Sequence, residues 1–191
     1  MMKLVLASAN SGKIDEFKEL FPNSEIIAYK DIVGDMDIIE NGCSFAENAK
    51  IKSETIFNKL DDSNMIVISD DSGISIKALN NEPGIYSARY AGEKATSKDN
   101  LEKVISTLKD KNIKQSEAFY TAAISITSKY GTVIVHGWMY GDVIDKKVGD
   151  KGFGYDPIFI PKGYNKTLGE LDHNIKKSIS HRRQAIDLAK L

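Results

Sequence analysis

The sequence predicts an α/β fold, because short apolar runs typical of strands alternate along the chain with runs of helical period. Residues 3–7 (KLVLA) form an apolar run of the kind expected for a buried strand, and apolar residues then recur at helical spacing from Ile14 to Phe21. Further along, residues 118–126 and 132–140 are two long β-rich runs separated by a short link, which favours adjacent antiparallel strands. These observations together predict a sheet flanked by helices.

Length and composition limit the classes of protein that the chain can be. Its 191 residues suit one large domain or two small lobes, and we expect a single domain over residues 1–191. The net charge of −1 argues against a nucleic-acid-coating protein, which would be basic, and no apolar run reaches membrane-spanning length. The single cysteine, Cys43, cannot form an internal disulfide. We therefore expect a cytoplasmic protein without a nucleic-acid or membrane partner.

Residues 8–13 (SANSGK) lie between the first predicted strand and the first predicted helix. Such a junction offers free backbone N–H groups and the positive end of a helix dipole, which suit phosphate oxygens, and Lys13 adds a full charge. The alternative is an ordinary capped helix start with Asn10 or Ser11 as the N-cap. The segment is not a Walker A loop, because Ile14 stands where that motif has Ser or Thr.

A second helix is predicted from Ser44 to about Leu60. Its start matches a capping box, so Glu47 has a structural explanation as the partner of the N-cap. Asn48 and Lys52 are four residues apart and share another face of the helix. Lys52 could reach a phosphate or simply be solvated, and both readings stay open on this spacing alone.

The most informative stretch is residues 65–68, an apolar strand that runs into Asp70 and Asp71. Neighbouring side chains on a strand point to opposite faces, so one carboxylate can face a cleft while the other faces amides or solvent. Carboxylate oxygens of this kind suit a hard cation such as Mg²⁺. Residues 72–73 (SG) predict a bend before a second strand at 74–76, and the alternative for the whole tetrapeptide at 70–73 is a simple turn.

Residues 152–157 (GFGYDP) combine glycines, which let a backbone approach a ligand closely, with two aromatic rings. Phe153 and Tyr155 offer flat faces on which a base could stack. The alternative is a glycine-rich turn before the next strand.

The last helix is predicted over residues 184–190, with Ser180 as its candidate N-cap. His181 and Arg182 would lie in its first turn, where cations oppose the helix dipole. This indicates that an anion or an acceptor oxygen is expected there, and the alternative is a solvated basic helix start.

Together these stretches resemble one family, the Ham1/RdgB-like inosine triphosphate pyrophosphatases, over residues 3–185. The motifs that carry the resemblance occur in the family's order at residues 8–13, 40–49, 69–73, 83–92, 152–157 and 180–182. The resemblance implies a two-lobed α/β fold with a long twisted mixed central sheet, flanking helices and a nucleotide cleft between the lobes. It also implies a homodimer and Mg²⁺ as the cofactor.

The implied reaction is the Mg²⁺-dependent hydrolysis of non-canonical purine nucleoside triphosphates (ITP, dITP and XTP) to the monophosphate and pyrophosphate, which cleanses the nucleotide pool. By the resemblance, Asp71 is the catalytic base, and Glu40 and Asp71 hold the metal. The positions implied to bind substrate are Ser8, Ala9, Asn10, Ser11, Gly12, Lys13, Lys52, Ser72, Phe153, Gly154, Tyr155, Asp156, Lys176, His181 and Arg182. The family usually has Thr where Ser8 stands, which keeps the hydroxyl.

Some assignments stay open at the level of sequence. Lys176 is chosen over Lys177, and the roles of Asp70, Glu47 and Asn48 are not separated. Base selection has a physical hypothesis: N–H groups of His181 and Arg182 would donate hydrogen bonds to the 6-keto oxygen of hypoxanthine or xanthine, whereas in adenine they would face the 6-amino group, which is itself a donor. No residue that would reject guanine at its 2-position is identified.

Three alternative functions are weighed. A non-catalytic nucleotide sensor would use the same pocket, and a Maf-like pyrophosphatase would act on other modified nucleotides. A two-carboxylate glycosidase is disfavoured, because adjacent residues on a strand diverge and would not flank one glycosidic bond.

Overall fold

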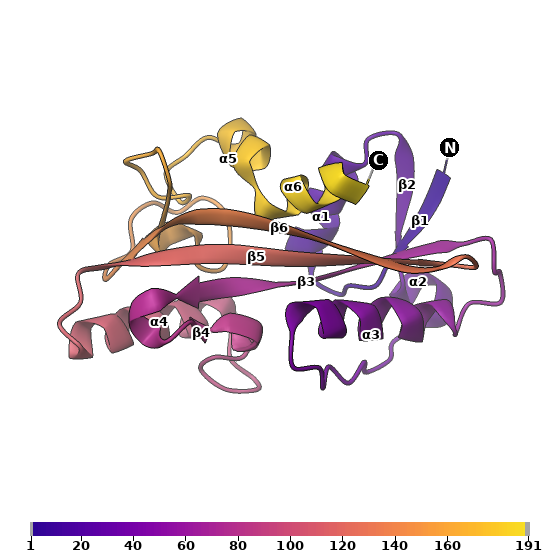
Figure 1. Cartoon of the computed structure of the whole chain (residues 1–191), viewed down its shortest axis with the longest axis horizontal. Coiled ribbons are helices and arrows are strands. Elements are labelled where there is room, and N and C mark those ends of the chain that lie inside the picture. The colour runs from indigo at the N-terminus through magenta and orange to yellow at the C-terminus, as the bar shows by residue number, and fades with distance from the viewer. Residues whose placement is uncertain (1, 190–191) are drawn as a thin grey trace. The chain divides into compact units, whose positions relative to one another are not determined.

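The computed structural model describes residues 2–189, so Met1 and the predicted end of the last helix at Lys190 lie outside the described residues. Within that range seven strands form one mixed sheet of order β2-β1-β3-β5-β6-β7, with β4 paired to β3 (Figure 1). The strands are β1 (Met2–Leu6), β2 (Ser24–Ala28), β3 (Ile66–Ile76), β4 (Glu82–Pro83), β5 (Gln115–Ser128), β6 (Gly131–Ile144) and β7 (Phe159–Pro161). The helices are α1 (Ser11–Leu20), α2 (Lys30–Val33), α3 (Phe45–Phe57), α4 (Ser97–Asp110), α5 (His173–Ile179) and α6 (His181–Ala189). The predicted α/β class and mixed central sheet with flanking helices are confirmed.

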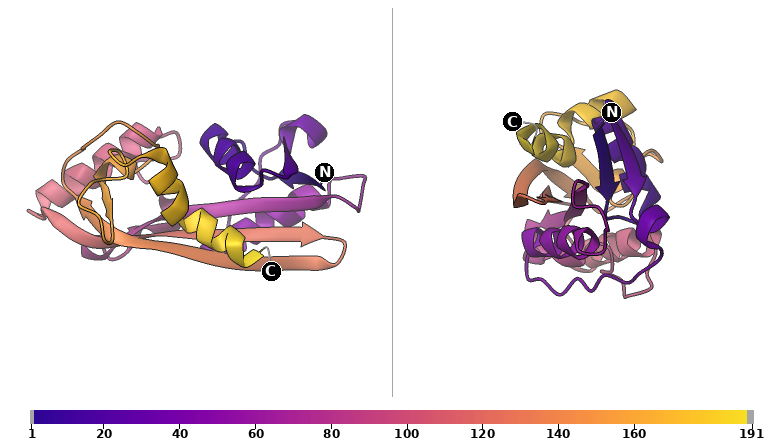
Figure 2. Two further views of the ribbon diagram at one scale, coloured as in Figure 1. Left: turned by 90° about the horizontal axis from the view of Figure 1, so that it is seen from above. Right: turned by 90° about the vertical axis from the view of Figure 1, so that its right-hand side faces the viewer.

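Strand direction in the sheet follows the connections. β1 pairs in parallel with both β2 and β3, and each of these pairings requires a crossover that contains helix. β5 and β6 are neighbours joined by only two residues, Lys129 and Tyr130, which requires antiparallel pairing, and Figure 2 shows them as a long hairpin. The predicted hairpin is therefore confirmed. None of the described helices is long and apolar enough to span a membrane.

The described chain divides into two compact units, of which the first contains residues up to Asp71, residues 122–136 and those from Ala185 onward. Its core follows the alternation of side chains on β1. Leu4 and Leu6 pack with residues of α1 and α6, whereas Val5 packs on the opposite face with Ile56 of α3. Figure 1 shows α3 on one side of these strands and α1 on the other. This first unit is a sheet with a helix layer on each face.

The second unit contains Ser72–Thr121 and Gly137–Gln184 and has its own apolar core. Its helix α4 begins with a capping box, in which Thr96 Oγ1 accepts a hydrogen bond from Asp99 N at 3.2 Å and the Asp99 carboxylate accepts one from Thr96 N at 2.8 Å. The buried face of α4 packs against β3, β5 and the segment around Ile158. This core supports the glycine-rich segment that carries Phe153.

The predicted bend between two strands at residues 72–73 is wrong, because β3 runs without interruption from Ile66 to Ile76. Gly73 serves another purpose. A Cβ at this position would lie 2.4 Å from Ser87 Oγ and 2.5 Å from the Gly84 carbonyl oxygen. Ser87 Oγ also accepts a hydrogen bond from Ile74 N at 2.9 Å. The glycine therefore lets residues 84–87 approach the strand closely and does not turn the chain.

Candidate active site

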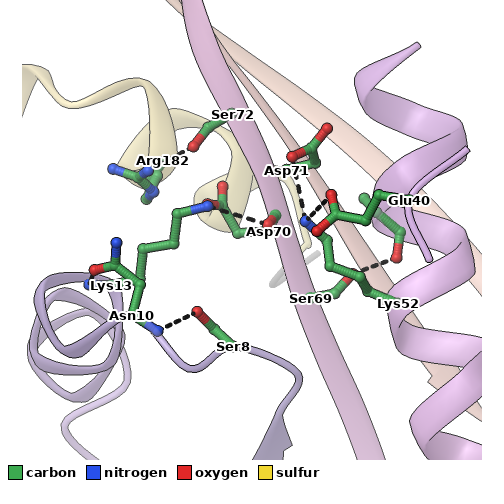
Figure 3. Close-up of polar contacts among 11 residues, drawn as sticks. Ser8, Asn10, Lys13, Glu40, Lys52, Ser69, Asp70, Asp71, Ser72 and Arg182 are labelled. Carbon is green, nitrogen blue, oxygen red and sulfur yellow. Dashed lines mark hydrogen bonds and ion pairs between the residues drawn. The ribbon is translucent and has the colours of Figure 1, made fainter. Parts of the chain in front are cut away.

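Asp70 and Asp71 lie side by side on β3 and point to opposite faces of the strand (Figure 3). Both are buried, with 1% and 8% of their surfaces exposed. Each meets a different lysine. Lys13 Nζ lies 2.7 Å from Asp70 Oδ2, and Lys52 Nζ lies 3.2 Å from Asp71 Oδ1. The expectation that one carboxylate faces amides or solvent is therefore wrong, because each faces an ammonium group.

The loop at residues 8–13 runs from the end of β1 into the first turn of α1. Asn10 is the N-cap, and its side chain accepts a hydrogen bond from Lys13 N at 3.1 Å. Asn10 N in turn donates to Ser8 Oγ at 3.2 Å. The Lys13 ammonium reaches back from this helix start to Asp70, which gives Asp70 a function that the sequence left open: it holds Lys13 in place. A helix N-terminus with a fixed lysine is suited to an anion.

Glu40, Lys52 and Asp71 form a second cluster in the same unit. Lys52 Nζ lies 2.9 Å from Glu40 Oε2 and 3.2 Å from Asp71 Oδ1, so one ammonium bridges two carboxylates that come from distant parts of the sequence (Figure 3). Lys52 is 7% exposed, so the alternative of a solvated lysine is wrong, and its ammonium group is instead buried and paired with carboxylates.

The pKa values in this cluster are perturbed by burial and charge together. Burial raises the pKa of Asp71 above its usual range, and the positive charge of Lys52 is the largest opposing cause. Burial lowers the pKa of Lys52, but the facing charges of Asp71 and Glu40 outweigh it and the net shift is upward. The lysine therefore stays charged and the cluster is electrostatically coupled.

The loop that carries Glu40 is attached to the first turn of α3. Gly42 N donates to Asn48 Oδ1 at 2.9 Å, and Cys43 N donates to Glu47 Oε2 at 2.6 Å. A Cβ on Gly42 would lie 2.7 Å from Glu47 Cβ and 2.8 Å from Asn48 Oδ1, so only glycine fits. Glu47 and Asn48, whose roles the sequence left open, thus anchor this loop.

Ser69 is a contact that the sequence did not predict. Its buried hydroxyl donates to the carbonyl oxygen of Ala49 on α3, one turn before Lys52 (Figure 3). This bond joins α3 to β3 beside the place where Lys52 meets Asp71. Ser69 belongs to the motif at residues 69–73, but its position on an apolar strand did not indicate that its hydroxyl would bind α3.

A divalent cation suits the oxygen atoms of this cluster. Asp71 Oδ2 is buried and has no hydrogen-bond partner, so it is free to act as a ligand. Among the described residues no group of three or more His, Cys, Asp or Glu side chains could hold a metal. Glu40 and Asp71 therefore supply too few ligands for a cage, but they match the way Mg²⁺ is often held, by one or two carboxylates with substrate phosphates and water.

The second unit brings together the glycine-rich segment and α5. Asp156 Oδ2 accepts hydrogen bonds from Lys176 Nζ at 2.6 Å and from Phe153 N at 2.8 Å. Lys176 Nζ also lies 4.7 Å from the centroid of the Phe153 ring, and the Arg182 guanidinium lies 5.7 Å from the same ring. Burial raises the pKa of Asp156, and Lys176 is the largest opposing cause. Lys176, the lysine chosen from the sequence, is thus part of this cluster.

The two aromatic rings of this segment differ in exposure. Phe153 is 40% exposed, whereas Tyr155 is 6% exposed and its hydroxyl donates to the Ser87 carbonyl at 2.7 Å. The expected stacking face of Tyr155 is therefore not available, because this ring belongs to the core. Gly154 lies between the two rings with a φ of +62°, a backbone conformation that favours glycine and lets the chain turn one ring outward and the next inward.

The start of α6 places His181 and Arg182 in the same unit. Both side chains are almost fully buried, and an Arg182 guanidinium nitrogen donates to Ser72 Oγ at 2.6 Å (Figure 3). The His181 ring stacks on Tyr120 of β5, a residue that sequence reasoning missed. Tyr120 lies far away along the chain, and its position in a β-rich run indicated only a strand.

Comparison with known proteins shows what the chain is similar to. A model of the Ham1 family matches residues 4–190. The dITP/XTP pyrophosphatase of Nautilia profundicola is 55% identical over 190 residues, which cover 100% of this chain and 96% of the relative. The dITP/XTP pyrophosphatase of Sulfurovum sp. is 54% identical over 193 residues, which cover 99% of this chain and 92% of the relative.

Solved structures agree with this match. The Ham1 protein of Staphylococcus aureus has a TM-score of 0.85 and 42% identity, covering 98% of this chain and 96% of the other. A HAM1 protein from Coxiella burnetii has a TM-score of 0.86 and 35% identity, covering 99% of this chain and 96% of the other.

Proposed function

The chain belongs to the Ham1 family, and on that basis we propose that it is a hydrolase that converts dITP, XTP and ITP to the nucleoside monophosphate and pyrophosphate. The observation that carries the proposal is the cluster of Glu40, Lys52 and Asp71 in the same unit as the Lys13 helix start. Paired carboxylates beside lysines are suited to triphosphate chemistry. The names of the relatives support the choice of substrate.

The phosphate part of the proposal uses residues of the first unit. Backbone N–H groups at the start of α1 and the Lys13 ammonium would bind oxygens of the leaving pyrophosphate and stabilise its developing charge. Lys52 would neutralise charge near Asp71. Asp71 would accept a proton from the water that attacks the α-phosphorus, because its burial already favours the protonated form more than in an exposed carboxyl group.

Mg²⁺ is the cofactor that we propose, with Glu40 and Asp71 as its protein ligands. When bound, it would neutralise charge on the phosphate oxygens and so favour attack at phosphorus. The buried Oδ2 atom of Asp71, which has no hydrogen-bond partner, supports this assignment.

The base part of the proposal uses residues of the second unit. Phe153 would stack on the purine, since it is the exposed ring of the glycine-rich segment. Donors of His181 and Arg182 would pair with the 6-keto oxygen, which adenine lacks. Loss of that pairing leaves buried donors facing a donor and can give large discrimination.

The test is pyrophosphate release from dITP, ITP, XTP, ATP and GTP, each with Mg²⁺ and with EDTA. Wild type should turn over the first three in a Mg²⁺-dependent way and the last two weakly, and Asp71→Asn should lose activity. As a control, Asp110→Asn removes an exposed carboxylate far along the chain from the cluster, and this variant should keep the activity of wild type. Tight dITP binding without turnover would instead identify a nucleotide sensor, and preference for other modified nucleotides would identify a Maf-like specificity.

Two further expectations belong to the same proposal. We propose a homodimer. Aromatic residues are enriched at protein interfaces, and Tyr86 is an aromatic residue with 55% of its surface exposed in the single chain. We also propose that the enzyme acts in the cytoplasm, which contains the nucleotide pool and in which its single cysteine would stay reduced. Light scattering at several protein concentrations would test the first, and cell fractionation the second.

A further inference from the structure

Tyr120 of β5 lies against the His181 ring in the core of the second unit. The two ring centroids are 4.9 Å apart with an interplanar angle of 15°, which is a parallel stack. On another side, the edge contact with Phe159 has a centroid distance of 4.8 Å and an angle of 60°. Tyr120 is 8% exposed, so neighbours on several sides fix its plane. A fixed phenol ring in turn restricts rotation of the imidazole stacked on it.

The hydroxyl of Tyr120 lies near the carboxylate of Asp156: burial raises the pKa of this hydroxyl well above its usual range, and the charge of Asp156 raises it further. Asp156 is the carboxylate that also accepts hydrogen bonds from Phe153 N and Lys176 Nζ. The ring of this buried side chain therefore stacks on His181, the residue expected to read the base edge, while its hydroxyl is affected by the charge of Asp156, the carboxylate that holds the stacking segment.

We propose that Tyr120 is a positioning residue for base selection, whose ring sets the plane of the His181 imidazole and so the direction of its hydrogen bond to the purine. This inference rests on the proposed function. Hydrogen bonds weaken steeply when their angle departs from linearity, so a rotated imidazole would contribute less to the 6-keto group. Without an aimed donor, the distinction between a 6-keto and a 6-amino purine diminishes.

The ring and the hydroxyl can be separated by two substitutions. Tyr120→Phe keeps the stack and removes the hydroxyl, whereas Tyr120→Leu removes the stack. Tyr140→Leu is the matched control, because this tyrosine of β6 is 60% exposed and its ring contacts Phe119 in a tilted arrangement instead of His181. The readout is the ratio of kcat/KM for dITP to kcat/KM for ATP. The amount of folded enzyme cancels in this ratio, so a purely structural role would not change it.

We expect Tyr120→Leu to lower the ratio by about 10-fold or more, and Tyr120→Phe and Tyr140→Leu to keep it within about 3-fold of wild type. An unchanged ratio in Tyr120→Leu, or a ratio in Tyr120→Phe as low as in Tyr120→Leu, would overturn the inference. Failure of wild type to hydrolyse dITP would instead refute the proposed function.

A readout without substrate keeps the inference testable if Tyr120→Leu does not fold. In the proton NMR spectrum, ring current from Tyr120 should shift the His181 ring protons upfield in wild type and equally in Tyr120→Phe, with His181→Gln identifying the signals. Signals of wild type at ordinary imidazole positions would show that the stack does not form in solution, and the inference would fail.

Discussion

The Lys52 ammonium lies 3.2 Å from Oδ1 of Asp71, and both side chains are buried. The same ammonium lies 2.9 Å from Glu40 Oε2. The lysine thus occupies the place between the two carboxylates to which we assign the metal. Lys52 and a divalent cation would both place a positive charge next to the same two carboxylates. Removal of Lys52 should therefore make the stability of the protein more dependent on the cation.

Lys52→Met is therefore expected to destabilise the metal-free protein by about 3–5 kcal/mol, because it leaves two facing carboxylates without their buried cation. Mg²⁺ should restore part of the loss, since a ligand that binds only the folded state stabilises it. Thermal unfolding in EDTA and at several Mg²⁺ concentrations measures both effects. Lys50→Met, on the exposed side of α3 with its nearest Glu54 oxygen at 3.8 Å, should change stability by no more than about 0.5 kcal/mol. Equal melting temperatures of Lys52→Met and Lys50→Met in EDTA would contradict this prediction.

The pKa of Asp71 should rise further in Lys52→Met. Burial raises this pKa and the charge of Lys52 opposes the rise, so removal of the charge leaves the raising cause alone. This shift also determines how stability depends on pH. A carboxyl group whose pKa is higher in the folded than in the unfolded state favours folding at low pH, and this contribution to stability is lost as the pH rises through the folded pKa. Carbon-13 NMR titration of the aspartate carboxyl groups in EDTA measures the shift, with Asp71→Asn to identify the signal. A midpoint that stays or falls would show that Lys52 does not control this carboxyl group.

Much of the fold was predictable because local rules and tertiary structure agree. Thr96 begins α4 with a capping box, and Ser44 caps α3 by accepting a hydrogen bond from Glu47 N at 3.2 Å. The opposite directions of Asp70 and Asp71 follow from the period of a strand alone.

The parts of the fold and of the site that could not be predicted depend on contacts between residues that are distant in sequence. Gly73 reads as a chain breaker, yet its absent side chain makes room for residues 84–87 next to a straight strand. Lys52 reads as a surface lysine until Glu40 and Asp71 are seen beside it. Tyr120 belongs to no recognisable sequence motif. Its contact with His181 arises only when β5 packs against the start of α6.

Gly42→Ala should displace the loop that carries Glu40. The new Cβ would lie 2.7 Å from Glu47 Cβ and 2.8 Å from Asn48 Oδ1, which requires movement of the loop or of the first turn of α3. We expect kcat/KM for dITP to fall about 10-fold or more, because displacement of Glu40, the proposed metal ligand, by about 1 Å would impair catalysis. Ile39→Ala, in the same loop with 77% of its surface exposed, should remain close to wild type. Full activity of Gly42→Ala would mean that the loop adjusts without effect on Glu40.

Ser69→Ala should loosen the attachment of α3 to β3. The lost hydrogen bond to the Ala49 carbonyl is buried, so we expect a decrease of about 1 kcal/mol in the free energy of unfolding, measured by urea denaturation. The matched control is Ser178→Ala, which removes a similar hydroxyl-to-carbonyl bond of 2.8 Å to Ile175 on the exposed part of α5. That change should remain below about 0.5 kcal/mol, because water replaces the lost partner at the surface. A loss in Ser69→Ala no larger than in the control would mean that apolar packing, and not this bond, holds α3 beside Asp71.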